Sequence, residues 1–202
     1  MGQKAVDGRT RRKMANRQAI LKAAKDVFLT KGYTNNTMME ISQKAGVGYG
    51  TLYSHFKGKD DMLKSLIAEV VSEFNSIISL PYQPETIEDV EFRQVRETRY
   101  LLQLAMDNRH ILQIAYEAMG RSETIKTSLD DQFKVYIDKA IEDLSYLCKK
   151  GLTKAGLNKE LAAKSIVYLS KEFFWDVVLE NESDIEAISK NITAIYLYGA
   201  AS

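Results

Sequence analysis

The feature that most constrains this chain is that its apolar residues recur with the period of an α-helix along almost its whole length. In residues 11–31, for example, apolar side chains stand at positions i, i+3, i+4, i+7 and i+8, which form one helix face: Ile20, Ala23, Ala24, Val27 and Phe28. We find no alternating or β-branched run bounded by turn residues, which a strand would require. The sequence therefore predicts an all-α fold.

Glycine, asparagine and proline residues divide this pattern into about nine expected helices. Thr37 with Glu40 three residues later is typical of a capping box at the start of a short second helix, and Gly46 allows a tight turn before the third. The other expected helices are 11–31, 48–56, 60–79, 85–106, 109–119, 122–150, 159–180 and 183–198.

The overall charge of +1 hides an asymmetry between the two ends of the chain. Residues 1–61 carry 12 Lys and Arg against 5 Asp and Glu, a net charge of +7, and residues 62–202 carry 16 against 22, a net charge of −6. A basic N-terminal part attracts a polyanion, and the acidic remainder repels one. We therefore expect two domains with different roles, residues 1–60 and a larger helical bundle at 61–202.

Short second and third helices joined by a tight glycine turn are the pattern of a helix-turn-helix. Apolar residues fix the angle between the helices and leave the outer face of the third helix free to enter a major groove. The inward anchors are Ile41, Ala45, Val47, Leu52 and Phe56. Gly48 and Gly50 weaken a helix interior and favour close approach of the backbone to another surface.

Residues 37–41, 45–56 and 59–63, which read TMMEI, AGVGYGTLYSHF and KDDML, resemble the DNA-binding domain of the TetR family of bacterial transcriptional regulators. The resemblance covers about residues 18–66, and the rest of the chain is similar only in layout. Gly48 departs from the pattern, because the family more often has Ser there. Glycine still serves as an N-cap, but it has no hydroxyl with which to reach a phosphate.

The resemblance implies a set of DNA-binding residues. Tyr49, Gly50 and Thr51 would lie at the base edges, whereas Thr37, Tyr53, His55, Lys59 and the first amides of the fourth helix would contact phosphates. From the residues themselves, Tyr53 could instead pack beside Leu52 and Phe56. Basic residues could add contacts from a flexible arm, namely Arg9, Arg11, Arg12 and Lys13.

Several functions lack support in the sequence. No catalytic motif and no set of metal ligands is found, so we expect no enzymatic activity, no cofactor and no metal. One cysteine and no long apolar run favour a cytoplasmic, nucleoid-associated protein that has no membrane partner. Two function classes stay open: a ligand-responsive repressor of a palindromic operator, and a DNA-bound interaction protein without a small-molecule ligand.

The last two expected helices predict a homodimer, because each is apolar on two sides. In 159–180 the stripes are Ala162, Ile166, Leu169, Phe173 and Val177, and Val167, Phe174 and Val178. In 183–198 they are Ile185, Ile188, Ile192 and Ile195, and Ala187, Ala194 and Tyr198. One stripe faces the chain's own core and the second needs a partner, which gives a two-fold four-helix bundle. Central helices of a monomer are the alternative.

A ligand pocket is expected among the helices of the larger domain. Arg99 falls four residues after Val95 and three before Leu102, which points it toward the apolar side, where an anionic fatty acid or acyl thioester would pair with it. The alternative is an ion pair of Arg99 with a carboxylate of its own domain, for instance Glu117 or Asp176. The other candidate ligand-binding residues are Arg96, Tyr100, Tyr116, Met119, Phe133, Tyr136 and Trp175.

Overall fold

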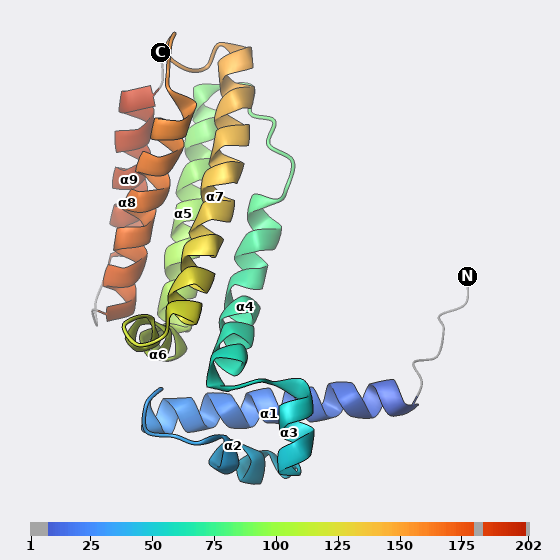
Figure 1. Cartoon of the computed structure of the whole chain (residues 1–202). Coiled ribbons are helices and arrows are strands. Elements are labelled where there is room, and N and C mark those ends of the chain that lie inside the picture. The colour runs from blue at the N-terminus through green and yellow to red at the C-terminus, as the bar shows by residue number, and fades with distance from the viewer. Residues whose placement is uncertain (1–7, 180–183, 201–202) are drawn as a thin grey trace. The chain divides into compact units, whose positions relative to one another are not determined.

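The structure is a computed structural model that describes residues 8–179 and 184–200, with side chains up to residue 197. Within these residues every regular element is a helix (Figure 1), as expected. The nine helices of this described part are α1 (Gly8–Lys31), α2 (Met38–Ala45), α3 (Tyr49–His55), α4 (Lys59–Ile78), α5 (Ile87–Asp107), α6 (Arg109–Met119), α7 (Glu123–Lys150), α8 (Lys159–Leu179) and α9 (Ile185–Ala200). The expected end at residue 180 and the side chain of Tyr198 lie outside the described residues.

The start of α1 corrects one expectation. Arg9, Arg11, Arg12 and Lys13 do not form a flexible arm, because α1 begins at Gly8 and these four residues are exposed positions on it. The segment after Gly8 has no proline or further glycine and is rich in Arg, Lys, Met and Ala, which propagate a helix that the buried part of α1 has already nucleated.

The chain forms two compact units by contact density, one made of the described residues up to 69 with 113–126, and one made of 70–112 with the described residues from 127 on. In the first unit, α1 packs on α2, and α2 on α3. Its core is fully buried at Ile20, Phe28, Ile41 and Leu52. The predicted inward face of α1 is thus confirmed. The functional division at residue 60 stays a prediction.

The second unit is a helical bundle. Its helix α5 packs against both α8 and α9, and α8 packs against α9. Residues from four helices meet in one apolar cluster that includes Val90 of α5, Leu144 of α7, Ala163 of α8 and Leu197 of α9. In Figure 1 these four helices run side by side in green, yellow, orange and red. No described helix is long and apolar enough to cross a membrane.

Candidate DNA-binding surface and internal cavity

A capping box and a glycine turn set the geometry of the helix-turn-helix. The Glu40 amide donates to Thr37 Oγ1 at 3.2 Å, and the Thr37 amide donates to Glu40 Oε2 at 2.9 Å. Gly46 ends α2 at φ 64°, a left-handed conformation that favours glycine. After it, Ser42 Oγ donates to the carbonyl of Val47 at 2.7 Å. The predicted capping box and turn are confirmed, and they fix where α3 starts.

Helix α3 is held from its inner side only. Leu52 is fully buried and Phe56, which follows the helix, is 2% exposed. Gly48 caps the helix without a side-chain hydrogen bond. On the outer side, a Cβ added at Gly50 would meet no atom within 4 Å, so the backbone there is open to approach by another molecule.

The outer face of α3 carries a preassembled pair of tyrosines. The rings of Tyr49 and Tyr53, which are 48% and 45% exposed, meet edge to face at 4.8 Å between centroids. Their hydroxyl oxygens lie 3.2 Å apart, and this hydrogen bond raises the pKa of Tyr49. Thr51 and His55 are half-buried beside them. The alternative in which Tyr53 packs beside Leu52 and Phe56 is not what the structure has, since Tyr53 packs on Tyr49.

Lys59 is engaged within the protein. Its ammonium donates to the carbonyls of Tyr33 at 2.8 Å, Asn36 at 3.2 Å and Thr34 at 3.4 Å, and lies 5.0 Å from the centroid of the Tyr33 ring. An ammonium has three donors, and all three are used here. A phosphate contact by Lys59 stays a prediction, and it requires the ammonium to leave these carbonyls.

Positive charge gathers around the end of α3. Arg17 of α1 donates to Ser65 Oγ at 3.0 Å, and its guanidinium lies 4.8 Å from the centroid of the Phe56 ring. Burial, and then the charges of Lys13 and Arg17, lower the pKa of His55. Basic side chains on α1 therefore lie close to α3. Their positive charge would attract a phosphate backbone.

Comparisons with known proteins agree with this geometry. The family model for bacterial regulatory proteins of the tetR family matches residues 20–66, which span the end of α1 through the first half of α4. The chain is thus similar to the TetR family over these residues, and α3 lies within the match.

Similarity to known proteins extends beyond residues 20–66. The fatty acid metabolism regulator protein of Bacillus subtilis is 24% identical over 181 residues, 89% of this chain and 93% of the relative. An HTH-type transcriptional regulator of Staphylococcus aureus is 34% identical over 102 residues, 48% of this chain and 52% of the relative.

Solved structures share the fold. A complex of SmeT with triclosan has a TM-score of 0.75 at 20% identity, covering 93% of this chain and 92% of that one. SmeT is the repressor of a multidrug efflux pump of Stenotrophomonas maltophilia. NalD, the secondary repressor of the MexAB-OprM multidrug efflux pump in Pseudomonas aeruginosa, has a TM-score of 0.70 at 19% identity, covering 95% of this chain and 98% of that one.

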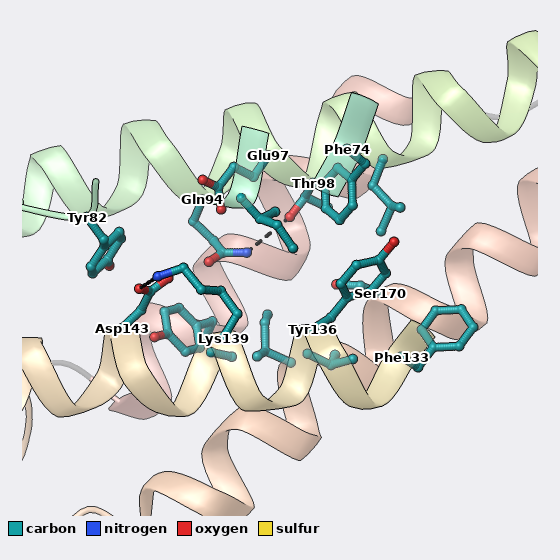
Figure 2. Close-up of a pocket in the computed structure, with 16 residues that line it drawn as sticks. Phe74, Tyr82, Gln94, Glu97, Thr98, Phe133, Tyr136, Lys139, Asp143 and Ser170 are labelled. Atoms are coloured by element: carbon teal, nitrogen blue, oxygen red, sulfur yellow. Dashed lines mark hydrogen bonds and ion pairs between the residues drawn. The ribbon is translucent and has the colours of Figure 1, made fainter. Parts of the chain in front are cut away.

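The second unit contains a cavity of about 90 Å³ (Figure 2). Its walls come from the end of α4, the segment after it, α5, α7, α8 and α9. Figure 2 shows Tyr82, Gln94, Glu97, Lys139 and Asp143 toward one end, and Phe74, Thr98, Phe133, Tyr136 and Ser170 toward the other. The cavity is thus amphipathic, with a charged end and an aromatic end.

Two ion pairs lie at the charged end, each between residues one helical turn apart. Arg93 Nε donates to Glu97 at 2.6 Å, and Lys139 Nζ donates to Asp143 at 2.5 Å. Burial raises the pKa of both carboxyl groups although each has a cation beside it. The desolvation of the two carboxylates therefore outweighs the attraction of their cations.

The aromatic end holds a buried hydroxyl without a partner. Tyr136 is 9% exposed, and among the described residues none hydrogen-bonds its hydroxyl. Its ring meets Phe74 edge to face at 5.1 Å and Phe133 at 6.0 Å. A buried hydroxyl costs free energy until water or a ligand pairs with it.

The predicted ligand-binding residues separate into two groups. Phe133 and Tyr136 line the cavity, as expected. The expectation that Arg99 points to the apolar side is wrong, because Arg99 is exposed and pairs with Glu186 at 3.4 Å. This pair confirms the alternative of a carboxylate partner within its own domain, although the partner is Glu186. The position of Arg99 in the helical repeat put it near the edge of the apolar stripe, and at an edge a long cationic side chain extends into water.

The remaining candidates lie away from the cavity walls. Tyr100 donates to Glu73 at 2.8 Å, and Trp175 is buried against Phe174 at 5.1 Å between ring centroids. Arg96 is exposed near the Phe92 ring, Tyr116 is 43% exposed, and Met119 is half-buried. Tyr116 and Met119 belong to the first unit, whereas the cavity is lined by the second.

Sequence reasoning missed the charged end of the cavity. Glu97, Lys139 and Asp143 line this end, and Arg93 pairs with Glu97 without lining the cavity itself. One signal was present: Arg93 with Glu97, and Lys139 with Asp143, are opposite charges four residues apart. That spacing is equally typical of solvated pairs, so the pattern alone does not reveal burial.

The expected dimer face stays a prediction. Ile195, a member of a predicted stripe of α9, is 63% exposed, whereas Leu161 and Tyr168 of α8, which are 62% and 51% exposed, belong to neither predicted stripe. Members of both predicted stripes of α8 are nevertheless buried within the unit, as Val177 and Val178 show. The exposed apolar residues therefore extend along α8 and α9 outside the core.

Proposed function

We propose that this protein is a dimeric TetR-family repressor that binds a palindromic operator and is released from it by a small hydrophobic or amphipathic molecule. The observation that carries the proposal is the amphipathic cavity with its unpartnered Tyr136 hydroxyl, in a chain that also presents an exposed reading helix. The ligand-bound SmeT complex, the NalD repressor and the fatty acid regulator support the same reasoning by similarity.

For DNA we assign two kinds of contact. Tyr49, Gly50 and Thr51 would read base edges from the exposed start of α3, whereas Thr37, Tyr53, His55 and Lys59 would contact phosphates. Gly48, the N-cap of α3, would lie at the same surface without a side-chain contact. The exposed basic residues at the start of α1 would add phosphate contacts from an ordered helix rather than from an arm. Two copies of α3 related by a dimer axis would enter successive major grooves about 34 Å apart.

For assembly we propose that the exposed apolar residues of α8 and α9 pair across a two-fold axis. Sedimentation equilibrium at micromolar concentration tests this. A mass near twice the 22.9 kDa of one chain supports the dimer, and a mass near one chain overturns it.

For release we propose coupling through α4. This helix runs from Lys59 to Ile78, so Phe74 and Ile78 of the cavity wall lie on the same helix as the residues that follow α3. A ligand that prefers one position of α4 would favour the DNA-free state. The largest shift that the ligand can produce between the two states equals the difference between its binding free energies for them.

Selection of bound fragments from random double-stranded DNA tests the DNA assignment. A palindrome is expected for the wild type. Tyr49→Ala and Thr51→Ala should relax the selected sequence, whereas Tyr53→Phe should weaken all sequences alike. If Tyr49→Ala leaves the selected sequence unchanged, base reading by this residue is misassigned.

Operator affinity with and without a panel of acyl thioesters and hydrophobic drugs then tests the ligand response. A drop in affinity with one compound class supports the repressor. If no compound changes the affinity, the alternative function of an interaction protein without a ligand takes its place, and the cytoplasmic, nucleoid-associated location proposed here would apply to both.

A further inference from the structure

The charges that face the cavity are unequal in number. Among its lining residues Glu97 and Asp143 are acidic and Lys139 is basic. The Lys139 ammonium lies 2.5 Å from Asp143 and 3.7 Å from Glu142, so two carboxylates already share its charge. Among the residues that line the cavity, acidic side chains therefore outnumber basic ones by one.

The nearby Arg93 balances the charge of Glu97, but its N–H donors are used within the protein. Arg93 is not among the lining residues, and its guanidinium donates to Glu97 at 2.6 Å, to the Pro81 carbonyl at 2.7 Å and to the Leu80 carbonyl at 3.1 Å. It also lies 4.6 Å from the centroid of the Tyr82 ring. These contacts occupy N–H donors of the Arg93 guanidinium and hold them away from an incoming ligand.

The protein environment shifts the pKa of both carboxyl groups. Burial is the largest influence on each, and it raises the pKa of Glu97 and of Asp143 despite Arg93 and Lys139. An additional positive charge would stabilise the ionised carboxylates, and an additional negative charge would oppose them.

Aromatic rings complete the environment. Tyr82 lies at the charged end, and Phe74 and Tyr136 pack edge to face at the other end. Ring faces attract cations, and they also pack against an aromatic body. The volume of about 90 Å³ restricts the ligand to a small molecule unless side chains move.

We propose that the cavity selects a small organic cation, with its ammonium at Glu97 and Asp143 and its aromatic or aliphatic body at Phe74 and Tyr136. This inference rests on the proposed function, because it names the ligand class of the same cavity. It replaces the anionic ligand expected from Arg99, whose guanidinium lies outside the cavity.

Three probes with one carbon skeleton test the sign of the charge: 2-phenylethylamine, 2-phenylethanol and phenylacetate at pH 7.5. Calorimetric titration of the full-length protein should give about tenfold or tighter binding of the amine over the alcohol, and weaker binding of phenylacetate. Equal affinity for amine and alcohol, or a preference for phenylacetate, overturns the proposal.

Substitutions locate the effect. Glu97→Gln and Asp143→Asn should bring the amine close to the alcohol in affinity while the alcohol itself still binds, which shows that the cavity is intact. The matched control is Asp138→Asn, an exposed residue of α7 outside the cavity, which should keep the wild-type preference. Retention of the full amine preference in both cavity variants would overturn the assignment of Glu97 and Asp143.

Operator binding separates this inference from the proposed function. The DNA sequence selected above is titrated with protein in the presence of each probe. Tight amine binding that leaves operator affinity unchanged sinks the ligand-responsive function and leaves the charge assignment standing. Release of the operator by phenylacetate but not by 2-phenylethylamine keeps the ligand-responsive function and overturns the charge assignment.

Discussion

Tyr49 and Tyr136 show how differently the two units hold a tyrosine. Tyr49 is 48% exposed on α3, and its hydroxyl lies 3.2 Å from that of Tyr53, where water also reaches it. Tyr136 is 9% exposed, and no described residue pairs with its hydroxyl. The exposed hydroxyls of α3 therefore cost no folding free energy when no DNA is bound, whereas the unpaired hydroxyl in the cavity does.

This difference extends from side chains to whole regions. The first unit keeps its candidate functional residues on the surface and relies on a separate apolar core at Phe28, Ile41 and Leu52. In the second unit the candidate site lies inside the bundle, where Phe74 and Tyr136 form core and cavity wall at once. We therefore expect stability and function to separate cleanly in the first unit and to be coupled in the second.

The largest expected effect concerns the core of the first unit. Leu52→Ala removes a fully buried side chain under α3 and should lower the free energy of unfolding by about 2–5 kcal/mol. DNA binding should be lost although no outer residue changes. Denaturant unfolding followed by circular dichroism measures it. The control, Tyr49→Ala, should change stability by about 0.5 kcal/mol or less. A larger loss of stability in Tyr49→Ala would show that the first unit does not separate the residues for stability from those for DNA reading.

The next effect concerns Lys59. Lys59→Met removes three donors to backbone carbonyls and should destabilise the protein by about 1–3 kcal/mol. DNA affinity should fall because the start of α4 is loosened. The dependence of affinity on salt separates the two roles, since loss of a phosphate contact lowers the slope by about one unit. An unchanged slope supports the internal role, and a lowered slope shows that Lys59 reaches phosphate in the complex.

The same contrast explains what the sequence could predict. The capping box, the glycine turn and the buried face of α1 follow from local rules about residue spacing, and all three are confirmed. The start of α1 was predicted three residues late, because helix ends depend on weak propensities. The outer face of α3 was predictable because exposed positions need no partner.

The cavity was less predictable because it depends on which helices meet. Phe133 and Tyr136 were identified as large residues on an apolar face, and that holds. Arg99 was misplaced because a period of 3.6 residues defines a face to within about half a turn, which does not separate a buried position from an edge. Glu97 and Asp143 are recognised only once α5 and α7 are seen to face each other (Figure 2).

A smaller effect tests the unpaired hydroxyl itself. Tyr136→Phe removes the hydroxyl and leaves the ring, so the ligand-free protein should become more stable by about 1 kcal/mol. Tyr53→Phe is the matched control, where the hydroxyl is exposed and paired and the change should stay within about 0.5 kcal/mol. Thermal and denaturant unfolding measure both. A loss of stability in Tyr136→Phe would mean that ordered water already pairs with the hydroxyl.

The smallest expected effect is a pair of opposite pH dependences. In the first unit, the hydrogen bond from Lys31 and then that from the Thr37 backbone lower the pKa of Glu40 below its ordinary 4.5. The folded state therefore holds its proton less tightly than the unfolded state. Glu40 contributes stability that is present above pH 4.5 and is lost as the pH falls through the lowered pKa.

Glu97 in the second unit has the reverse sign. Burial raises its pKa above 4.5, against the lowering influence of Arg93 and Arg96 on its own helix and together with the raising influence of Asp143 on α7. Asp143 is itself paired with Lys139, and Tyr82 and Tyr196 are further titratable groups of the cavity lining. The folded state holds the proton more tightly, so stability falls as the pH rises from 4.5 through the raised pKa.

Unfolding free energies measured from pH 3 to pH 8 in Glu40→Gln and Glu97→Gln separate the two. Relative to the wild type, Glu40→Gln should flatten the loss of stability below pH 4.5, and Glu97→Gln should flatten the decline above it. A constant offset from the missing ion pair with Arg93 does not alter these slopes. The same sign of change in both variants would mean that Glu97 is as well compensated as the surface carboxylate, and the cavity would then have no deficit of positive charge for a ligand to fill.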